Sequence, residues 1–194
     1  MQTSTPYSTR IVNAFALAHR VHADQVRRGS GVPYITHVMA VAGIVGEHGA
    51  DEDTFIAALL HDAAEDGGGH ETLAEIRAEF GDRVADFVAA CSDTCETPKP
   101  AWRERKERYI ASLRNAPDEV RLIVAADKLH NICATTNDFY AHGEAVWERF
   151  NGGRDGTLWY YIAITDALAQ GWNHELIEDL TAAVEDLVES VDAE

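Results

Sequence analysis

The sequence lacks the long apolar runs and the cysteine content that mark two large classes of protein. No window approaches the roughly 20 consecutive apolar residues that a membrane span needs, and the N-terminal segment has no apolar core like that of a secretory signal. The chain holds 3 cysteines, and an odd number without such a signal is typical of a reducing compartment. We therefore expect a cytoplasmic protein without membrane contact, in which Cys91, Cys95 and Cys133 are small buried side chains.

Positive charge is also scarce, since 16 Lys and Arg residues face 33 Asp and Glu residues and the formal net charge is −17. A polyanion would be repelled, so nucleic acid is not an expected partner. A small anionic substrate needs only a local basic patch. One such patch is formed by Lys99, Arg103, Arg105, Lys106 and Arg108. Because Glu104 and Glu107 lie among them, the same residues can instead be the solvated face of a helix.

Alternating strand patterns, repeats and low-complexity linkers are lacking as well, whereas apolar residues recur at three to four positions. The pattern predicts helices over about 7–24, 34–48, 51–66, 71–80, 82–91, 102–114, 118–136, 141–150, 158–170 and 175–191. A chain of 194 residues fits one domain with one core. We expect an all-α, single-domain bundle of about eight to ten helices.

The densest polar cluster is the segment 61–66, which follows the apolar run 57–60. Its ionisable residues are His61, Asp62, Glu65 and Asp66, and their spacing places them on adjacent turns of one predicted helix. Such groups after an apolar run are costly unless a cation offsets the cost. An imidazole nitrogen and a carboxylate oxygen can bind one divalent ion. The alternative is a solvated helix end, which the helix dipole slightly disfavours for acidic residues.

Two further segments carry candidate ligands inside apolar helices. His37 lies in the segment 33–42 and Asp127 in the segment 124–131. A lone histidine in such a helix is more often a satisfied core residue than a ligand. A buried aspartate needs a partner, and we expect Lys128, its neighbour in sequence, to point elsewhere on the helix.

Other histidines compete as ligands. His130 follows Asp127 by three residues, and His19 and His22 form a second pair at the same spacing. Spacing alone does not choose among them. We interpret His130 as a residue that supports the site or the fold rather than as a ligand.

The order His, His-Asp, Asp on helices resembles the HD superfamily of metal-dependent phosphohydrolases. Three segments are similar to the hydrolase domain of the RelA/SpoT alarmone enzymes, namely 27–37 (RRGSGVPYITH), 59–66 (LLHDAAED) and 126–131 (ADKLHN). The similarity is strong over about 15–131, is looser up to about 168, and leaves helices over about 138–191 as a C-terminal part of one domain spanning 1–194. The chain has no room for the synthetase and regulatory regions of the long enzymes, so it resembles the small alarmone hydrolases.

The resemblance implies a metal site, a pair of catalytic acids and a substrate. The implied ligands of one divalent ion, usually manganese with zinc or iron as alternatives, are His37, His61, Asp62 and Asp127. Glu65 and Asp66 are implied to orient or deprotonate the attacking water. The implied substrate is a small anionic nucleotide, guanosine tetra- or pentaphosphate, which loses its 3′-pyrophosphate.

Residues that contact the nucleotide are expected on both sides of the metal ligands. The resemblance implies that Asn131 contacts the ribose and that Arg27 and Arg28 border the base and phosphate. Lys128 and these arginines can neutralise phosphates, and Tyr160 and Tyr161 can either stack on a purine or pack in the core.

The segment 147–161 matches no motif of the long enzymes, and its glycines fit either a phosphate contact or a helix end. Two other functions therefore stay open: an HD phosphohydrolase for a nucleoside monophosphate or the 2′-phosphate of NADPH, and a catalytically silent nucleotide sensor. The sequence does not indicate the oligomeric state.

Overall fold

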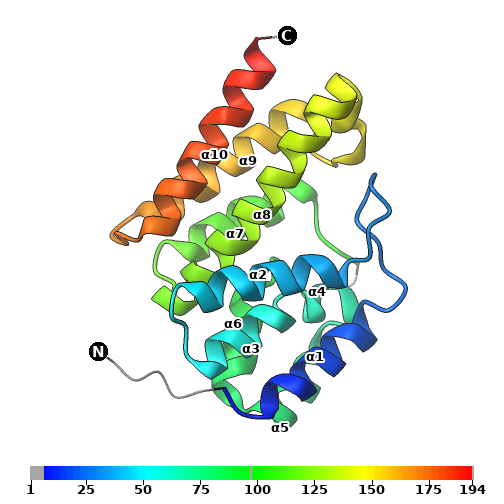
Figure 1. Cartoon of the computed structure of the whole chain (residues 1–194), viewed down its shortest axis with the longest axis vertical. Coiled ribbons are helices and arrows are strands. Elements are labelled where there is room, and N and C mark those ends of the chain that lie inside the picture. The colour runs from blue at the N-terminus through cyan, green and yellow to red at the C-terminus, as the bar shows by residue number, and fades with distance from the viewer. Residues whose placement is uncertain (1–6, 97, 194) are drawn as a thin grey trace. The chain divides into compact units, whose positions relative to one another are not determined.

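The computed structural model describes residues 7–96 and 98–193, and within these ranges the chain is helical (Figure 1). The described residues form ten α-helices and one 3-10 helix, and their only strand-like pairing is an isolated antiparallel bridge between Val26 and Pro33. This confirms the all-α prediction. None of the described helices combines the length and the apolar character that crossing a membrane requires.

The chain divides into two compact units, Met1–Lys99 and Pro100–Glu194, here called unit 1 and unit 2. The prediction of one domain over the whole chain stays a prediction. The helices of unit 1 are α1 (Arg10–Val21), α2 (Ile35–Glu47), α3 (Glu52–Leu60), α4 (Ala63–Gly67), α5 (His70–Phe80) and α6 (Asp82–Cys91).

Helix α3 forms the core of unit 1. It packs against α1, α2 and α6, and Ile56 and Leu60 are completely buried among them. The helix begins where the Asp51 carboxylate accepts a hydrogen bond of 2.9 Å from the Thr54 backbone N–H, a typical N-cap. This buried, capped helix gives a rigid base to the residues that follow it.

The expectation of one continuous helix through the segment 61–66 is wrong. Helix α3 ends at Leu60, His61 and Asp62 form a turn, and α4 begins at Ala63. In a continuous helix the Ala58 carbonyl would accept from the Asp62 N–H. Here the Nδ1 of His61 lies 2.8 Å from that carbonyl oxygen and occupies it. The break therefore satisfies the end of α3 with the side chain of a candidate ligand.

Unit 2 contains the remaining helices. They are α7 (Trp102–Leu113), α8 (Asp118–His142), the 3-10 helix η1 (Gly143–Arg149), α9 (Gly153–Ala169) and α10 (Glu175–Asp192). Helix α10 packs along α8 and α9, and α7 packs on α9 (Figure 1). The predicted helix over 141–150 is wrong, because α8 continues to His142 and a 3-10 turn follows.

Helix α8 continues past its predicted end at about residue 136 to His142, and its threonines are accommodated by hydrogen bonds within the helix. The hydroxyls of Thr135 and Thr136 donate to the carbonyls of Asn131 and Ile132, four residues earlier, so these β-branched residues do not stop it. It ends at Gly143, whose φ of 58° is favourable only for glycine.

Arg121 joins the start of α8 to the ends of two neighbouring helices. Its guanidinium is buried and donates to the carbonyls of Arg114 and Ala116, which follow α7, at 2.5 and 3.0 Å. It also donates to the carbonyls of Leu168 and Gln170 at the end of α9, at 3.4 and 2.8 Å. Carbonyls at helix ends need such partners. The Arg121 side chain therefore provides hydrogen-bond donors for the ends of two helices.

We expect Arg121→Met to lower the free energy of unfolding by about 3 kcal/mol, because buried carbonyls lose a charged donor. Urea denaturation followed by circular dichroism measures this value. Arg108→Met is the matched control, since Arg108 is an exposed arginine of the same unit. Equal stability of the two variants would contradict this account of Arg121.

The cysteine prediction is correct only in part. Cys91 is buried, Cys95 is partly exposed and Cys133 is exposed on α8. Cys133 follows the buried Ile132 by one position, which rotates it away from the core face of the helix.

Candidate metal centre and active site

Two histidine rings of unit 1 face each other at the start of α2 and the end of α3. His37 is completely buried and His61 is 2% exposed, and their ring centroids are 5.3 Å apart in an edge-to-face arrangement. One ring nitrogen of each lies within 4.8 Å of the other. Both histidines predicted as ligands are thus brought together, although they are 24 positions apart in the sequence.

The Asp62 carboxylate meets both rings. Its Oδ2 lies 3.0 Å from Nε2 of His61 and 3.6 Å from Nε2 of His37. The hydroxyl of Tyr34 donates to the same oxygen at 2.6 Å. Asp62 is only partly buried, with 19% of its side chain exposed, so this group of donors is open on one side.

The chemistry of these donors fits a cation. The Ala58 carbonyl only accepts, so Nδ1 of His61 carries the hydrogen of their 2.8 Å contact and Nε2 of the neutral ring has a lone pair. That lone pair points at a carboxylate oxygen 3.0 Å away. Two lone pairs at this distance repel each other unless a proton or a metal ion lies between them. A histidine whose other nitrogen is held by a backbone carbonyl is the usual metal-binding arrangement.

Glu65, on α4, lies in a pocket of mixed charge. Burial raises the pKa of its carboxyl and the nearby Asp93 raises that pKa further, whereas the Lys99 ammonium, 2.9 Å from Oε1, opposes both effects. A carboxyl with a raised pKa is suited to accept a proton near neutral pH.

A glycine turn brings the charged neighbours of Glu65 to α4. Gly68 and Gly69 end the helix with φ values of 126° and 65°. A Cβ on Gly69 would lie 2.9 Å from the backbone oxygen of Cys95, so only glycine at position 69 lets the backbone of Cys95 approach this closely. Cys95 is thereby held against the end of α4, and Lys99 reaches Glu65.

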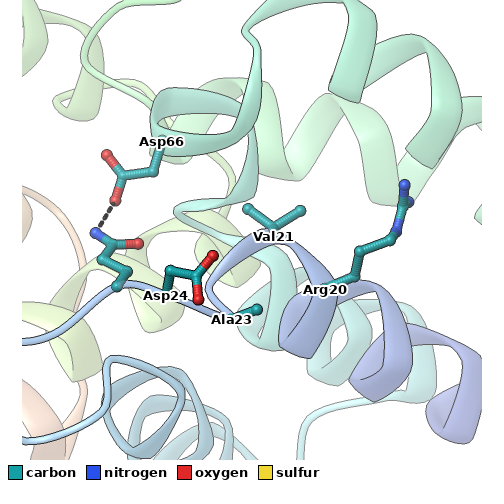
Figure 2. Close-up of a pocket in the computed structure, with 6 residues that line it drawn as sticks. Arg20, Val21, Ala23, Asp24 and Asp66 are labelled. Carbon is teal, nitrogen blue, oxygen red and sulfur yellow. Dashed lines mark hydrogen bonds between the residues drawn. The ribbon is translucent and has the colours of Figure 1, made fainter.

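Asp66 lies on the exposed side of α4. Its Oδ2 accepts a hydrogen bond of 2.8 Å from Nε2 of Gln25, drawn as the dashed line in Figure 2. Asp66 and Gln25 border a cavity of about 350 Å³ that is also lined by Arg20, Val21, Ala23 and Asp24. The two predicted catalytic acids therefore have different surroundings, since Glu65 is partly buried and Asp66 is exposed.

The predicted nucleotide contacts of unit 1 lie in the loop before α2. Arg27 is partly buried and Arg28 is exposed. The Arg27 backbone N–H donates to the Val32 carbonyl at 2.8 Å, which fixes the position of the loop. Two other histidines were candidate ligands. His19, on α1, is exposed, and His22, at the end of α1, is buried.

In unit 2, Asp127 is a buried carboxylate on α8, with 7% of the residue exposed. It accepts from Nζ of Lys128 at 2.6 Å and from the amide of Asn131 at 2.5 Å. The prediction that Lys128 points elsewhere is wrong, because its long side chain bends back to its neighbour. Burial by itself would lower the pKa of Lys128, but Asp127 raises it well above the usual value, so the ammonium stays charged. His130 is partly exposed on the same helix.

The two tyrosines of α9 are buried, with 8% of Tyr160 and 6% of Tyr161 exposed. Burial raises the pKa of Tyr161 to about 12, and its hydroxyl lies 3.4 Å from that of Thr135. The ammonium of Lys106 lies 4.6 Å and that of Lys128 5.6 Å from the centre of the Tyr160 ring. Tyr161 therefore packs in the core, which is one of its two predicted roles. Tyr160 is also buried, but its ring lies near two ammonium groups.

Packing explains Gly152 and Gly156 of the segment 147–161, whereas Gly153 has a φ of 60°, which favours glycine. A Cβ on Gly152 would lie 2.7 Å from the ring of Trp102, and one on Gly156 3.3 Å from it. The Trp102 ring fills this space and meets Trp159 edge to face. Arg103 covers the other ring, with its guanidinium 3.3 Å from the Trp159 centroid. The basic patch predicted over 99–108 is thus partly used in cation–π contacts.

Sequence reasoning missed three residues of the site. Tyr34 bonds to Asp62, Gln25 to Asp66, and Asp93 acts on Glu65. Tyr34 precedes His37 by three positions, which places it on the same side of the chain and was a usable signal. Gln25 and Asp93 offered no signal, because their partners lie far away in the sequence.

A protein-family model described as "HD domain" matches residues 14–158, a range that covers parts of both units and every predicted ligand. The chain is also 42% identical over 124 residues to the Mycobacterium leprae (strain TN) protein "Probable GTP pyrophosphokinase", covering 63% of this chain and 15% of the relative. It is 36% identical over 129 residues to "Bifunctional (p)ppGpp synthase/hydrolase SpoT" of Escherichia coli (strain K12), covering 63% and 18%. The chain therefore spans less than a fifth of these relatives.

A solved structure matches almost the whole chain. It is described by the words "A metazoan ortholog of SpoT hydrolyzes ppGpp and plays a role in starvation responses". The match has a TM-score of 0.78 and 26% sequence identity, and it covers 94% of this chain and 97% of the other. The match supports the all-α fold over the 94% of the chain that it covers.

Proposed function

This chain belongs to the HD domain family, and from that premise we propose that it is a metal-dependent hydrolase of alarmone nucleotides. It removes the 3′-pyrophosphate of guanosine tetra- or pentaphosphate and releases pyrophosphate with GDP or GTP. The observation that carries the proposal is the convergence of His37, His61 and Asp62 beside the two carboxylates of α4. The relative named for (p)ppGpp hydrolysis and the solved structure described as hydrolysing ppGpp support this substrate.

As part of the proposal, Asp127 is the fourth ligand. Its support is a buried carboxylate on a helix of unit 2 that falls inside the family match. Two imidazoles and two carboxylates contribute a charge of about −2, which one divalent ion neutralises. This nitrogen and oxygen set suits manganese, with zinc or iron as alternatives. We also place the protein in the cytoplasm, as expected from its sequence.

A bound divalent ion withdraws charge from a phosphoryl oxygen and lowers the pKa of a coordinated water. The chain then supplies the proton transfer and the orientation. Glu65 accepts the proton of the attacking water, and Asp66 holds the water in place. Lys99, 2.9 Å from Glu65, favours the ionised form of this carboxyl.

The remaining predicted contacts bind the nucleotide, and each stays a proposal. Cationic and polar groups pair with the phosphates and the ribose, and an aromatic face can stack on the guanine. The proposed contacts are Arg27, Arg28, Lys128, Asn131, Tyr160 and Tyr161. Tyr161 is the weakest of these, because its ring is buried and its hydroxyl lies beside Thr135.

The test is an assay of the purified, Mn²⁺-loaded protein with guanosine tetraphosphate. We expect stoichiometric pyrophosphate and GDP, measured by separate detection of pyrophosphate and orthophosphate. A parallel panel holds nucleoside monophosphates and NADPH. Orthophosphate from either would replace the proposal with another phosphohydrolase, and tight nucleotide binding without turnover would replace it with a sensor.

The charges around Glu65 predict two opposite shifts of the pH–rate profile. Activity falls as the pH drops through the pKa of Glu65, because a protonated base cannot accept a proton. Lys99→Met removes the group that lowers this pKa, so we expect the acidic limb of kcat to move to higher pH. Asp93→Asn removes a group that raises it, so the limb moves to lower pH. Asp82→Asn, an exposed carboxylate elsewhere in unit 1, is the control, and shifts of the same sign in both test variants would contradict the base assignment.

A further inference from the structure

We propose that His22, Gln25 and Tyr34 form a positioning unit that fixes the carboxylates of Asp62 and Asp66 from outside the metal centre. None of the three is a proposed ligand or catalytic group. The inference rests on the proposed function for the roles of the two aspartates. It concerns residues of unit 1 alone.

A short loop places Gln25 and Tyr34 next to each other. The backbone N–H of Tyr34 donates to the Gln25 carbonyl at 2.9 Å, and that of Arg27 donates to the Val32 carbonyl at 2.8 Å. Between these bonds lies the antiparallel bridge of Val26 and Pro33. Because Gln25 and Tyr34 share a backbone hydrogen bond, movement of one displaces the other.

Gln25 orients Asp66 and is itself oriented by His22. An ionised carboxylate only accepts, so the group 2.8 Å from Asp66 Oδ2 is the Gln25 NH₂ (Figure 2). The amide oxygen must then face the opposite way, where it lies 2.6 Å from Nδ1 of His22. That nitrogen therefore carries a hydrogen. His22 is 2% exposed, so its ring cannot turn to water as an alternative partner.

Tyr34 orients the other carboxylate, that of Asp62. Its hydroxyl donates to Asp62 Oδ2 at 2.6 Å. The centre of its ring lies 5.0 Å from that of His22 and 5.2 Å from that of His37. The same buried histidine thus supports both the amide that holds Asp66 and the ring that holds Asp62.

The two aspartates need this support for different reasons. Asp66 is exposed and lines a cavity of about 350 Å³, so its carboxylate would otherwise rotate among several positions. Asp62 faces two histidine nitrogens, and a carboxylate that ligates a metal is bound more tightly when a hydrogen bond fixes its orientation. Loss of such an outer partner costs about 10- to 100-fold in metal affinity or activity.

The test uses the full chain and substitutions that remove only one polar group. Tyr34→Phe keeps the ring and is expected to weaken Mn²⁺ binding at least about 10-fold in calorimetry. Gln25→Leu is expected to lower kcat for guanosine tetraphosphate about 10-fold or more while Mn²⁺ affinity stays within about twofold. The matched controls are Tyr140→Phe and Gln170→Leu, which alter exposed residues of unit 2 and should leave both values unchanged.

The tautomer of His22 gives a readout that needs neither metal nor activity. In the ¹⁵N-histidine spectrum of the metal-free protein, with the signal assigned through His22→Phe, the Nδ1–H form should dominate. Gln25→Leu should lose that preference. His19→Phe, an exposed position on the same helix, is the control for the assignment variant, and thermal melts show that each variant is folded.

The outcomes separate the two proposals. If the wild-type protein binds Mn²⁺ but turns over no guanosine tetraphosphate, the proposed function fails, while the Mn²⁺ affinity of Tyr34→Phe and the His22 tautomer still decide the positioning unit. If folded Tyr34→Phe binds Mn²⁺ as the wild type does, or if His22 carries its hydrogen on Nε2, the positioning unit is overturned.

Discussion

We expect His61→Ala to abolish Mn²⁺ binding and to lower the proposed hydrolysis of guanosine tetraphosphate about 1,000-fold. A bound divalent ion supplies several kcal/mol of transition-state stabilisation, and each 1.4 kcal/mol corresponds to about tenfold in rate. His61 has the largest expected effect among the ligands because its two nitrogens serve two structures. Nδ1 closes the end of α3 through the Ala58 carbonyl, and Nε2 faces Asp62.

The measurements are Mn²⁺ titration by calorimetry and initial rates at saturating metal. His70→Ala is the control, since this histidine is exposed at the start of α5 in the same unit. Chelation of the wild-type protein should reproduce the loss, and added Mn²⁺ should restore activity to the wild type but not to the variant. A folded His61→Ala protein that still binds Mn²⁺ and hydrolyses the nucleotide would remove His61 from the metal centre.

The proposed ligands of unit 1 could be singled out in the sequence because they break the apolar pattern of their helices. A histidine in the segment 33–42 and a His-Asp pair after the run 57–60 are costly to bury without compensation. The structure buries His37 and His61 and brings both rings to Asp62. The apolar periodicity predicted the helices, and the order of the motifs predicted a metal-dependent hydrolase.

The break at His61 could not be predicted from periodicity. The residues around it are good helix formers, and spacing alone favours one helix through Asp66. What ends α3 is a single side-chain contact with the Ala58 carbonyl, which depends on the ring orientation. That orientation is set by three-dimensional packing rather than by local propensity.

The partners of the carboxylates were missed for a related reason. Gln25 reaches Asp66 across 41 positions and Tyr34 reaches Asp62 across 28. Such contacts follow from how a loop folds back on a helix. No helical or strand period encodes the contact of Gln25, and for Tyr34 only its spacing from His37 pointed to the site. The same holds for Gly152, which packs against Trp102, a residue 50 positions away in the sequence. In the sequence alone, the glycines around Gly152 resemble a phosphate-binding loop.

We expect Glu65→Gln to lower kcat by about 100- to 10,000-fold, the range for removal of a general base, while Mn²⁺ affinity stays within about twofold. Glutamine has nearly the same shape and keeps an oxygen for Lys99, so the variant removes the basicity and little else. Glu71→Gln, an exposed glutamate of α5, is the control. Full activity of Glu65→Gln together with loss of activity in Asp66→Asn would move the base to Asp66.

The same substitution should stabilise the metal-free protein, which separates a functional residue from a structural one. Burial and Asp93 raise the pKa of Glu65 in the folded state. A raised carboxyl pKa contributes stability below the unfolded pKa and loses it as the pH rises through the folded value. At neutral pH the ionised Glu65 therefore opposes folding, and glutamine removes that cost. We expect the thermal midpoint of metal-free Glu65→Gln to exceed that of the wild type at pH 7 and the difference to shrink towards pH 4. A lower midpoint at pH 7 would mean that the Lys99 ion pair outweighs desolvation and that Glu65 is held there for stability.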